Sequence, residues 1–121
     1  MLVDDDEFLL DMYSLKFREA GFEVDLARGG EDALTILRGG ATPDIILLDI
    51  VMPKVDGFEF LRMANKENLK KAAKVIVLSN LGQKEDIDKG ISLGASDYIV
   101  KANSTPSEVV KKVETLLAKT S

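Results

Sequence analysis

Asp44-Ile-Ile-Leu-Leu-Asp49 is the stretch that decides the fold of this chain, because four aliphatic residues run directly into a carboxylate. A short and continuously apolar run is typical of a strand buried on both faces. Open α/β sheets place their ligand crevices at the carboxyl ends of such strands, where Asp49 would lie. A carboxylate there needs a partner or a metal ion, since burying it alone is costly. Taken alone, the stretch is equally compatible with a strand that ends in a solvated turn marked by Pro53 and Gly57.

The rest of the chain alternates between strand and helix patterns. Strands are predicted at residues 1–3, 22–26, 75–78 and 97–101 besides the Asp49 strand, and 22–26 alternates as an edge strand does. Helices are predicted between them at about 7–20, 31–37, 58–65, 84–93 and from 106 onward. This alternation predicts a parallel sheet with helices on both faces. A doubly wound, five-stranded, flavodoxin-like (βα)5 sheet with strand order 2-1-3-4-5 suits this length.

Composition limits the chemistry that the chain can perform. Its 121 residues predict one domain over residues 1–121. The chain has no cysteine and no histidine, which excludes disulfides, thiol catalysis, Ser-His-Asp triads and histidine metal sites. The net charge of −5 argues against direct contact with nucleic acid or an anionic membrane surface. With no signal peptide or long apolar span evident, we expect a cytoplasmic protein.

The first helix carries more apolar surface than one core contact needs. Two stripes run along it, one made of Leu9, Tyr13, Phe17 and Ala20 and the other of Phe8, Met12 and Leu15. The favoured interpretation is a deeply packed helix, and the alternative is a face on which a partner docks.

Two later helices carry clear local signals. Segment 84–93 is polar and has an interior glycine, Gly90, which costs about 1 kcal/mol relative to alanine. We therefore expect it to be an element of low stability that can move. Thr105-Pro-Ser-Glu108 predicts a capping box with proline at the first helical position.

Five polar residues follow strands that share one edge of the predicted sheet, namely Asp4, Asp5, Asp49, Ser79 and Lys101. Each has a plain structural interpretation by itself, such as a turn hydroxyl or a surface lysine. The convergence of all five on one edge has no such plain interpretation. Crowded carboxylates repel one another, which raises at least one pKa unless a cation intervenes. Mg²⁺ suits such a set, because it takes one or two carboxylates, a carbonyl and several waters.

These positions resemble the receiver domain of bacterial two-component response regulators, the family of the chemotaxis receiver. The resemblance rests on the Asp4-Asp5 pair, the segment Leu47-Leu-Asp-Ile-Val-Met-Pro-Lys-Val-Asp-Gly57, and the later Ser79 and Lys101. Ser79 follows Asp49 by 30 residues and Lys101 follows Ser79 by 22, intervals that suit the family. The resemblance covers essentially the whole chain.

For the acceptor, the resemblance implies that Asp49 attacks the phosphoryl group of a phosphohistidine. It also implies that Asp5, Asp49 and the backbone carbonyl of Val51 hold Mg²⁺, with Asp4 acting mostly through a metal-bound water. This agrees with the physics, because phosphoryl transfer needs positioning and neutralisation of charge more than covalent chemistry by side chains.

For the switch, the resemblance implies that Lys101 pairs with one phosphoryl oxygen and that Ser79 hydrogen-bonds another. Tyr98 is then the aromatic residue whose rotamer reports the state. The implied protein is a signalling switch and not a turnover enzyme.

The implied partners are a sensor histidine kinase or a histidine phosphotransfer protein, and a downstream protein effector or a fused output domain. Output would pass through the surface of the fourth helix, fifth strand and fifth helix, and a phosphorylation-dependent dimer is compatible with the family. Whether the chain stands alone or belongs to a longer regulator stays open.

The sequence departs from the family pattern at a few places. Ala102 stands where proline usually follows the lysine, so a cis bond there would be expensive. Ser79 replaces the commoner threonine. Val51 and Leu81 are apolar where the family often has polar residues, and we expect them to hinder attacking water and lengthen the life of the phosphorylated state.

Four rival functions fit the sequence less well. A hydrolase of the haloacid dehalogenase type needs a second aspartate two residues after the nucleophile, where this chain has Val51. A phosphorylation-independent interaction module would be favoured by the loss of a site residue, and none is lost. A nucleotide-binding module lacks its glycine-rich motifs, and an EF-hand starting at Asp4 would have Leu15 at its twelfth position.

Overall fold

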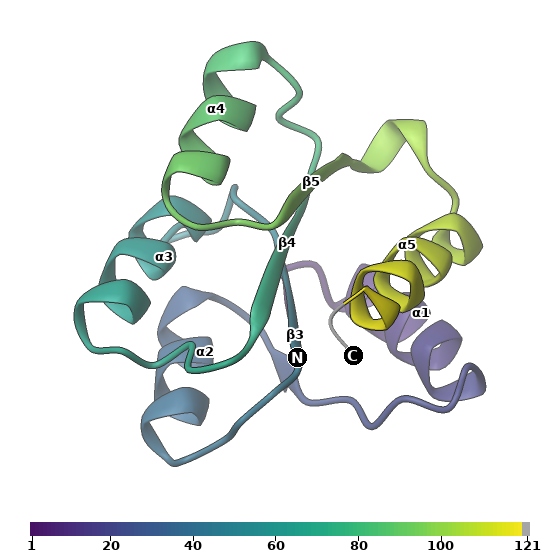
Figure 1. Ribbon diagram of the computed structural model, residues 1–121, viewed down its shortest axis with the longest axis horizontal. Coiled ribbons are helices and arrows are strands. Elements are labelled where there is room, and N and C mark those ends of the chain that lie inside the picture. The colour runs from purple at the N-terminus through teal and green to yellow at the C-terminus, as the bar shows by residue number, and fades with distance from the viewer. Residues whose placement is uncertain (120–121) are drawn as a thin grey trace.

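The computed structural model describes residues 1–119 as one parallel sheet covered by helices on both faces (Figure 1). Within these residues the sheet has five strands in the order β2-β1-β3-β4-β5, which confirms the predicted doubly wound topology. The strands are β1 (Leu2–Val3), β2 (Leu26–Ala27), β3 (Ile45–Leu48), β4 (Lys74–Ser79) and β5 (Asp97–Val100). The helices are α1 (Glu7–Glu19), α2 (Gly30–Arg38), α3 (Gly57–Lys66), α4 (Lys84–Ser92), the 3₁₀ turn η1 (Lys101–Asn103) and α5 (Pro106–Ala118).

The sheet divides the apolar interior into two cores. In β4, Val75 and Val77 face one core while Ile76 and Leu78 face the other, because successive strand residues point to opposite faces. The first core lies under α2 and α3, and the second lies under α1 and α5. Figure 1 shows α2, α3 and α4 on one side of the sheet and α1 and α5 on the other. Both faces of the central strands are therefore buried, as their continuous apolar sequences predict.

The register of the strands determines which side chains meet at the carboxyl edge. Val3 of β1 pairs with Leu48 of β3, so the next residue of each strand, Asp4 and Asp49, lie side by side. On the other side of β3, Leu48 pairs with Val77 in β4. The edge is therefore built around the ends of β1 and β3.

The second apolar stripe of α1 is only partly packed, so the helix is less deeply buried than the favoured interpretation expected. The side chains of Phe8 and Leu15 are 76% and 59% exposed. The helix contacts the core through Leu10, Tyr13 and Phe17, which share one face at helical spacing. Of the other stripe, Phe8 and Leu15 point to solvent, as the alternative interpretation expected, whereas Met12 is partly buried against the second core.

The edge strand was predicted too early in the chain. It was expected at 22–26, whereas β2 covers only Leu26–Ala27. Phe22 packs edge-on against Phe17 of α1, with ring centroids 5.2 Å apart, and this contact holds the preceding segment against the helix. Only the end of the segment enters the ladder.

Other local predictions are confirmed. Thr105 and Glu108 form the capping box at the start of α5, with Pro106 at its first position. All peptide bonds of the described residues are trans, the Lys101–Ala102 bond included. No helix in the described part of the chain combines the length and apolar character needed to cross a membrane.

Candidate functional site

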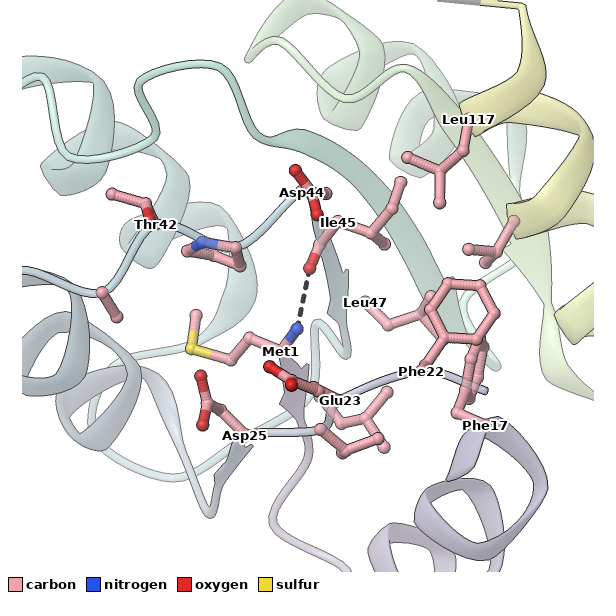
Figure 2. A pocket seen from close by; sticks show the side chains of 15 residues that line it. Met1, Phe17, Phe22, Glu23, Asp25, Thr42, Asp44, Ile45, Leu47 and Leu117 are labelled. Carbon is pink, nitrogen blue, oxygen red and sulfur yellow. Dashed lines mark hydrogen bonds between the residues drawn. The ribbon is translucent and has the colours of Figure 1, made fainter. Parts of the chain in front are cut away.

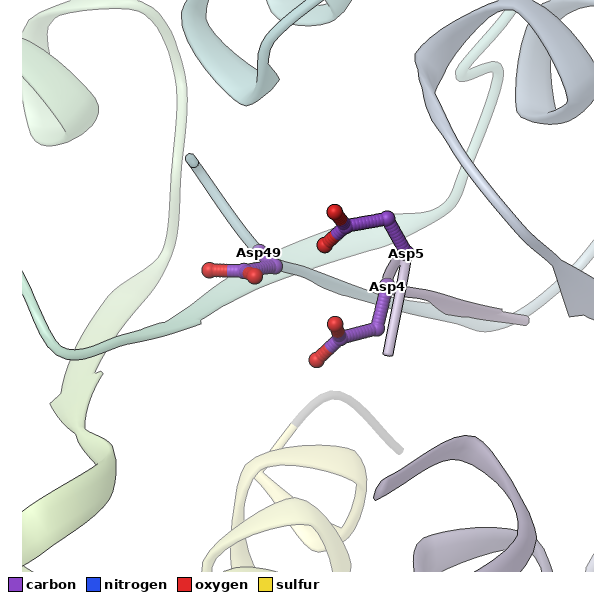
Figure 3. Close-up of side chains that lie close together, drawn as sticks. All are labelled: Asp4, Asp5 and Asp49. Carbon is purple, nitrogen blue, oxygen red and sulfur yellow. The ribbon is translucent and has the colours of Figure 1, made fainter. Parts of the chain in front are cut away.

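Three aspartates gather at the carboxyl edge of the sheet, as the sequence predicted. Asp4 and Asp5 follow β1, Asp49 follows β3, and one carboxylate oxygen from each lies within 4.8 Å of the others. Figure 3 shows the side chains of Asp4 and Asp5 extending toward the space beside Asp49. Asp4 and Asp49 are buried, whereas Asp5 is exposed. The cluster thus has a buried base and an opening to solvent.

Lys101 lies between the two buried carboxylates. Its Nζ atom is 2.8 Å from Oδ2 of Asp4 and 3.3 Å from Oδ2 of Asp49, and its side chain is 12% exposed. Lys101 begins the 3₁₀ turn directly after β5, so β5 delivers it to this edge. Burial by itself lowers the pKa of Lys101, but the hydrogen bond and charge of Asp4 and the charge of Asp49 more than offset it, and the pKa is raised. The side chain is therefore a fixed positive charge.

The surroundings of Asp49 disfavour the charged form of its carboxyl group. Burial raises its pKa, the charge of Asp4 raises it further, and Lys101 and the backbone N–H of Ile50 lower it without cancelling the rise. Its Oδ1 atom accepts a hydrogen bond of 2.8 Å from the N–H of Ile50, and its Oδ2 atom faces Lys101. Additional positive charge would relieve this carboxylate.

Asp4 and Asp6 have different tasks. Asp4 accepts a hydrogen bond from the N–H of Asp6 at 3.0 Å in addition to its ion pair with Lys101. Asp6 caps α1 by accepting hydrogen bonds from the N–H groups of Phe8 and Leu9. Asp6 is thus committed to the helix terminus, where a carboxylate is stabilising.

Gly57 holds the loop after β3 against the site. From the sequence, this glycine was interpreted only as the marker of a possible turn. The N–H of Gly57 donates to the carbonyl of Ile50 at 2.9 Å, and a Cβ atom at Gly57 would lie 2.7 Å from Cδ1 of Ile50 and closer still to the carbonyl oxygen of Asp49. Any side chain there would push α3 away from the end of β3. The signal in the sequence is the pair Asp56-Gly57, because Asp56 caps α3 through the N–H of Glu59.

Ser79 and Tyr98 meet at the backbone of one residue, Leu81, that the sequence did not identify as a link. The fully buried Oγ of Ser79 accepts a hydrogen bond from the N–H of Leu81 at 3.2 Å. The Tyr98 hydroxyl donates to the carbonyl oxygen of Leu81 at 2.5 Å. Burial, reinforced by the charge of Asp86, raises the pKa of Tyr98, so the phenol stays a hydrogen-bond donor at neutral pH. Leu81 therefore joins the two predicted switch residues through its peptide groups.

Apolar side chains border the site at the two positions that the sequence singled out. Val51, just after the acceptor strand, is 61% exposed, and Leu81 is partly buried against the first core. Tyr13, predicted only as a core residue, also lines a small cavity of about 10 Å³ together with Asp4 and Asp49. That volume holds about one water molecule.

A larger cavity lies at the opposite end of the strands and does not include the carboxylate cluster. It has a volume of about 320 Å³ and is lined by Met1, Phe17, Phe22, Asp25 and Asp44 among others (Figure 2). In Figure 2 the amino group of Met1 donates to the carbonyl of Ile45, over 2.8 Å. None of the five predicted site residues, Asp4, Asp5, Asp49, Ser79 and Lys101, lines this cavity.

The carboxylate cluster fits a hard divalent cation. It offers oxygen ligands from three residues, one of them exposed, and Mg²⁺ favours one or two carboxylates together with waters. A bound cation would also supply the positive charge that the raised pKa of Asp49 calls for. The described residues can therefore hold a metal ion.

Comparison with known proteins connects this geometry to a family. Residues 1–114 match the family model described as the response regulator receiver domain. The chain is 36% identical over 117 residues to the transcriptional regulatory protein CusR of Escherichia coli, with 97% of this chain and 50% of that protein covered. It is 32% identical over 125 residues to the DNA-binding dual master transcriptional regulator RpaA of Synechocystis, with 99% and 49% covered. The chain spans about half the length of the curated relatives it matches.

Solved structures agree with the sequence comparisons. The receiver domain of the Francisella response regulator 1452 superimposes with a TM-score of 0.87 at 30% identity, covering 99% of this chain and 96% of that one. The chemotaxis protein CheY4 of Vibrio cholerae superimposes with a TM-score of 0.85 at 29% identity, covering 94% and 93%. These matches confirm the predicted resemblance and fold. The expectation that nucleic acid is not a partner conflicts with the name of RpaA, since that whole protein is called DNA-binding.

Proposed function

The chain belongs to the response regulator receiver domain family, and on that premise we propose that it is a switch whose Asp49 accepts a phosphoryl group from the phosphohistidine of a partner protein. The observation that carries the proposal is the position of Asp49, a buried carboxylate with a raised pKa, beside Lys101 and two further aspartates. A carboxylate is a recognised nucleophile for forming an aspartyl phosphate.

The transfer exchanges one bond to phosphorus for another. A carboxylate oxygen of Asp49 attacks the phosphorus atom, the bond from phosphorus to the histidine nitrogen breaks, and its electron pair stays on that nitrogen. Lys101 already lies 3.3 Å from Asp49, so its ammonium group can follow the phosphoryl oxygens as their charge develops. Because this side chain is buried and fixed, it needs little reorganisation to act.

Mg²⁺ would supply a second positive charge opposite the phosphoryl oxygens. We propose Asp5, Asp49 and the backbone carbonyl of Val51 as its ligands, with Asp4 acting through a water molecule. Asp5 supports this assignment because it is exposed and unpaired with Lys101, whereas Asp4 is already in an ion pair.

We further propose that Ser79 and Tyr98 carry the signal outward. Ser79 accepts a hydrogen bond from the N–H of Leu81 and interacts with the Tyr98 phenol, and its own hydroxyl hydrogen can rotate to bond a phosphoryl oxygen. A movement of Ser79 toward the phosphoryl group would pull on Leu81, whose carbonyl holds the Tyr98 hydroxyl. The phosphoryl group would thereby bias the region between Ser79 and Tyr98 between two states.

The exposed stripe of α1 is the proposed docking surface for the phosphohistidine donor. Phe8, Met12 and Leu15 recur at helical spacing, and Phe8 and Leu15 are exposed large apolar residues of a kind that marks interaction sites. The stripe begins three residues after Asp5, so a donor bound to it would stand next to the acceptor. The donor would be a sensor histidine kinase or a histidine phosphotransfer protein.

The remaining assignments follow from the family and the chain's composition. We propose that residues 1–121 form one receiver domain, that it is cytoplasmic, and that it is a switch and not a turnover enzyme. Output would pass through α4, β5 and α5 to a protein effector or a fused output domain, with a phosphorylation-dependent dimer as one form of it. With a net charge of −5, these residues are not the part of a regulator that we expect to contact nucleic acid or a membrane.

Intact-mass spectrometry after incubation with acetyl phosphate tests the proposal. The parent protein should gain one phosphoryl mass with Mg²⁺ and none with excess chelator. Asp49→Asn should gain none, whereas the control Asp88→Asn, an exposed carboxylate on α4, should behave as the parent does. A folded parent protein that gains no phosphoryl group, or an Asp49→Asn variant that still gains one, would contradict the proposal.

A further inference from the structure

Helix α4 rests on the sheet through a glycine. Among the described residues of α4, Gly90 is the only one that is buried. An interior glycine weakens a helix, because it costs more backbone entropy than alanine and adds no side-chain contact. At a buried position that faces the sheet, an apolar side chain would normally be preferred. A local reason must therefore favour glycine at this place.

That reason is the ring of Tyr98. A Cβ atom built at Gly90 would lie 3.1 Å from Cδ2 and 3.3 Å from Cε2 of Tyr98, which is tighter than ordinary contact between carbon atoms. The same atom would be 3.6 Å from Cγ2 of Val77, an ordinary contact. Tyr98 is thus the neighbour that a side chain at position 90 would displace, while the sheet beneath would accept it.

The ring is held at its other end by a short hydrogen bond. The Tyr98 hydroxyl donates to the carbonyl oxygen of Leu81 at 2.5 Å, and the N–H of Leu81 in turn donates to Oγ of Ser79. A ring pushed outward by a methyl group would lengthen the bond to Leu81. With α4 in its present position, the Tyr98 hydroxyl can therefore reach the carbonyl of Leu81 only because position 90 has no side chain.

The two ends of α4 differ in the side-chain contacts that they make. Its C-terminal end is tied to α3, because the side chain of Asn65 donates to the carbonyl of Leu93 at 2.8 Å. Lys89 lies 4.5 Å from the centre of the Phe58 ring. At the other end, Gln83 provides no side-chain cap. The contact of Gly90 with Tyr98 lies close to the end that Asn65 holds.

We propose that Gly90 is a positioning residue, because its missing side chain leaves room for the Tyr98 ring against α4. We call this contact the Gly90 seat. Through it, Gly90 couples the ring to α4 and so determines how strongly a phosphoryl group at Asp49 affects this helix. The seat is a property of the unphosphorylated protein, whereas its role in coupling rests on the proposed function. Replacing Gly90 by alanine should leave phosphoryl transfer intact and disturb what Tyr98 reports.

A double-mutant cycle on thermal stability tests the seat without any phosphorylation. In a Tyr98→Ala background, Gly90→Ala should raise the melting temperature by about 3 to 5 °C, because alanine favours the helix and no ring is displaced. In the parent background the same change should give no rise, or a fall. Equal rises in melting temperature in both backgrounds would overturn the proposal that Gly90 makes room for the Tyr98 ring.

Tyrosine fluorescence tests the coupling. The chain has two tyrosines and no tryptophan, so Tyr13→Phe leaves Tyr98 as the only aromatic emitter of this kind. With Mg²⁺ and acetyl phosphate, this protein should change its emission, and adding Gly90→Ala should reduce that change at least about twofold while intact mass shows the same phosphoryl gain. An unchanged response at equal phosphoryl gain would overturn the coupling.

The two tests fail separately. No phosphoryl gain in the Tyr13→Phe protein and in the parent would overturn the proposed function and the coupling together, and the stability cycle would still decide whether Gly90 seats the ring.

Discussion

Removing the positive charge from the carboxylate cluster should destabilise the fold, and Lys101→Met is the sharpest way to do so. Methionine keeps the length and apolar stem of lysine but not its ammonium group. At an effective dielectric constant of about 20, unit charges at the observed separations of 2.8 and 3.3 Å attract by about 5 to 6 kcal/mol for each pair. Desolvation offsets part of this, and breaking buried pairs by removing one partner typically costs about 3 to 5 kcal/mol.

Urea unfolding followed by far-ultraviolet circular dichroism measures this cost, since the chain has no tryptophan to report it. With a typical slope of about 1.5 kcal/mol per molar urea, the midpoint should fall by about 2 to 3 M at neutral pH. A marginally stable domain has about 5 to 15 kcal/mol in total, so the variant should remain folded without urea.

Asp49→Asn supplies the control. Burial and the charge of Asp4 raise the pKa of Asp49, so folding favours the neutral form of this carboxyl group. The stability that this preference contributes is fully present below the ordinary pKa of about 3.9 and is lost as the pH rises through the raised value. At neutral pH, Asp49→Asn should therefore stabilise the parent and recover part of the loss in Lys101→Met. A loss below about 1 kcal/mol in Lys101→Met, or no recovery in the double variant, would refute this account of the site's electrostatics.

Three further predictions concern other parts of the molecule. Ser14→Ala should stabilise the protein by about 1 kcal/mol in urea unfolding, because the buried Ser14 hydroxyl has no hydrogen-bond partner among the described residues. Val51→Asn should shorten the life of the phosphoprotein by about tenfold, as measured by loss of the phosphoryl mass over time, because an amide can orient attacking water where an apolar side chain hinders it. Glu108→Gln should lower the melting temperature at neutral pH but not in acid. The backbone and side-chain hydrogen bonds of Thr105 lower the pKa of Glu108, so the stability from its charge is present above the ordinary pKa of about 4.3 and is lost as the pH falls through its lowered value.

Each of these predictions has an outcome that contradicts it. A lower urea midpoint for Ser14→Ala would mean that the hydroxyl stabilises the helix. An unchanged decay rate in Val51→Asn would remove the proposed hindrance to water. If Glu108→Gln lowers the melting temperature as much at low pH as at neutral pH, the glutamine disturbs the helix for reasons other than charge.

The centre of the fold and the site were predictable because they depend on strand ends. Parallel strands share one carboxyl edge, so a carboxylate after Leu48 and another after Val3 had to meet once the topology was identified. The arrival of Lys101 at this edge followed from the same argument, whereas its ion pairs with Asp4 and Asp49 are a finding of the structure. Such contacts need only the order and register of the strands.

Features that depend on packing between helices and loops were not predictable in the same way. Two apolar stripes on α1 look alike in sequence, and only the position of the sheet decides that Tyr13 is buried and Phe8 is not. The link through Leu81 uses backbone groups, which leave no trace in the residue types. Gly90 was visible as a weak point of its helix, but its neighbour Tyr98 was visible only in three dimensions.

Locating the phosphoryl group on the chain tests the central claim most directly. After reaction with acetyl phosphate and Mg²⁺, borohydride reduces an aspartyl phosphate to an alcohol, which marks the acceptor permanently. Trypsin should release residues 39–54, a peptide that contains both Asp44 and Asp49, so fragmentation of this one peptide includes an internal control. We predict reduction at Asp49 alone. Reduction at Asp44, Asp4 or Asp5, or an unmodified peptide from a protein that has gained the phosphoryl mass, would contradict the account.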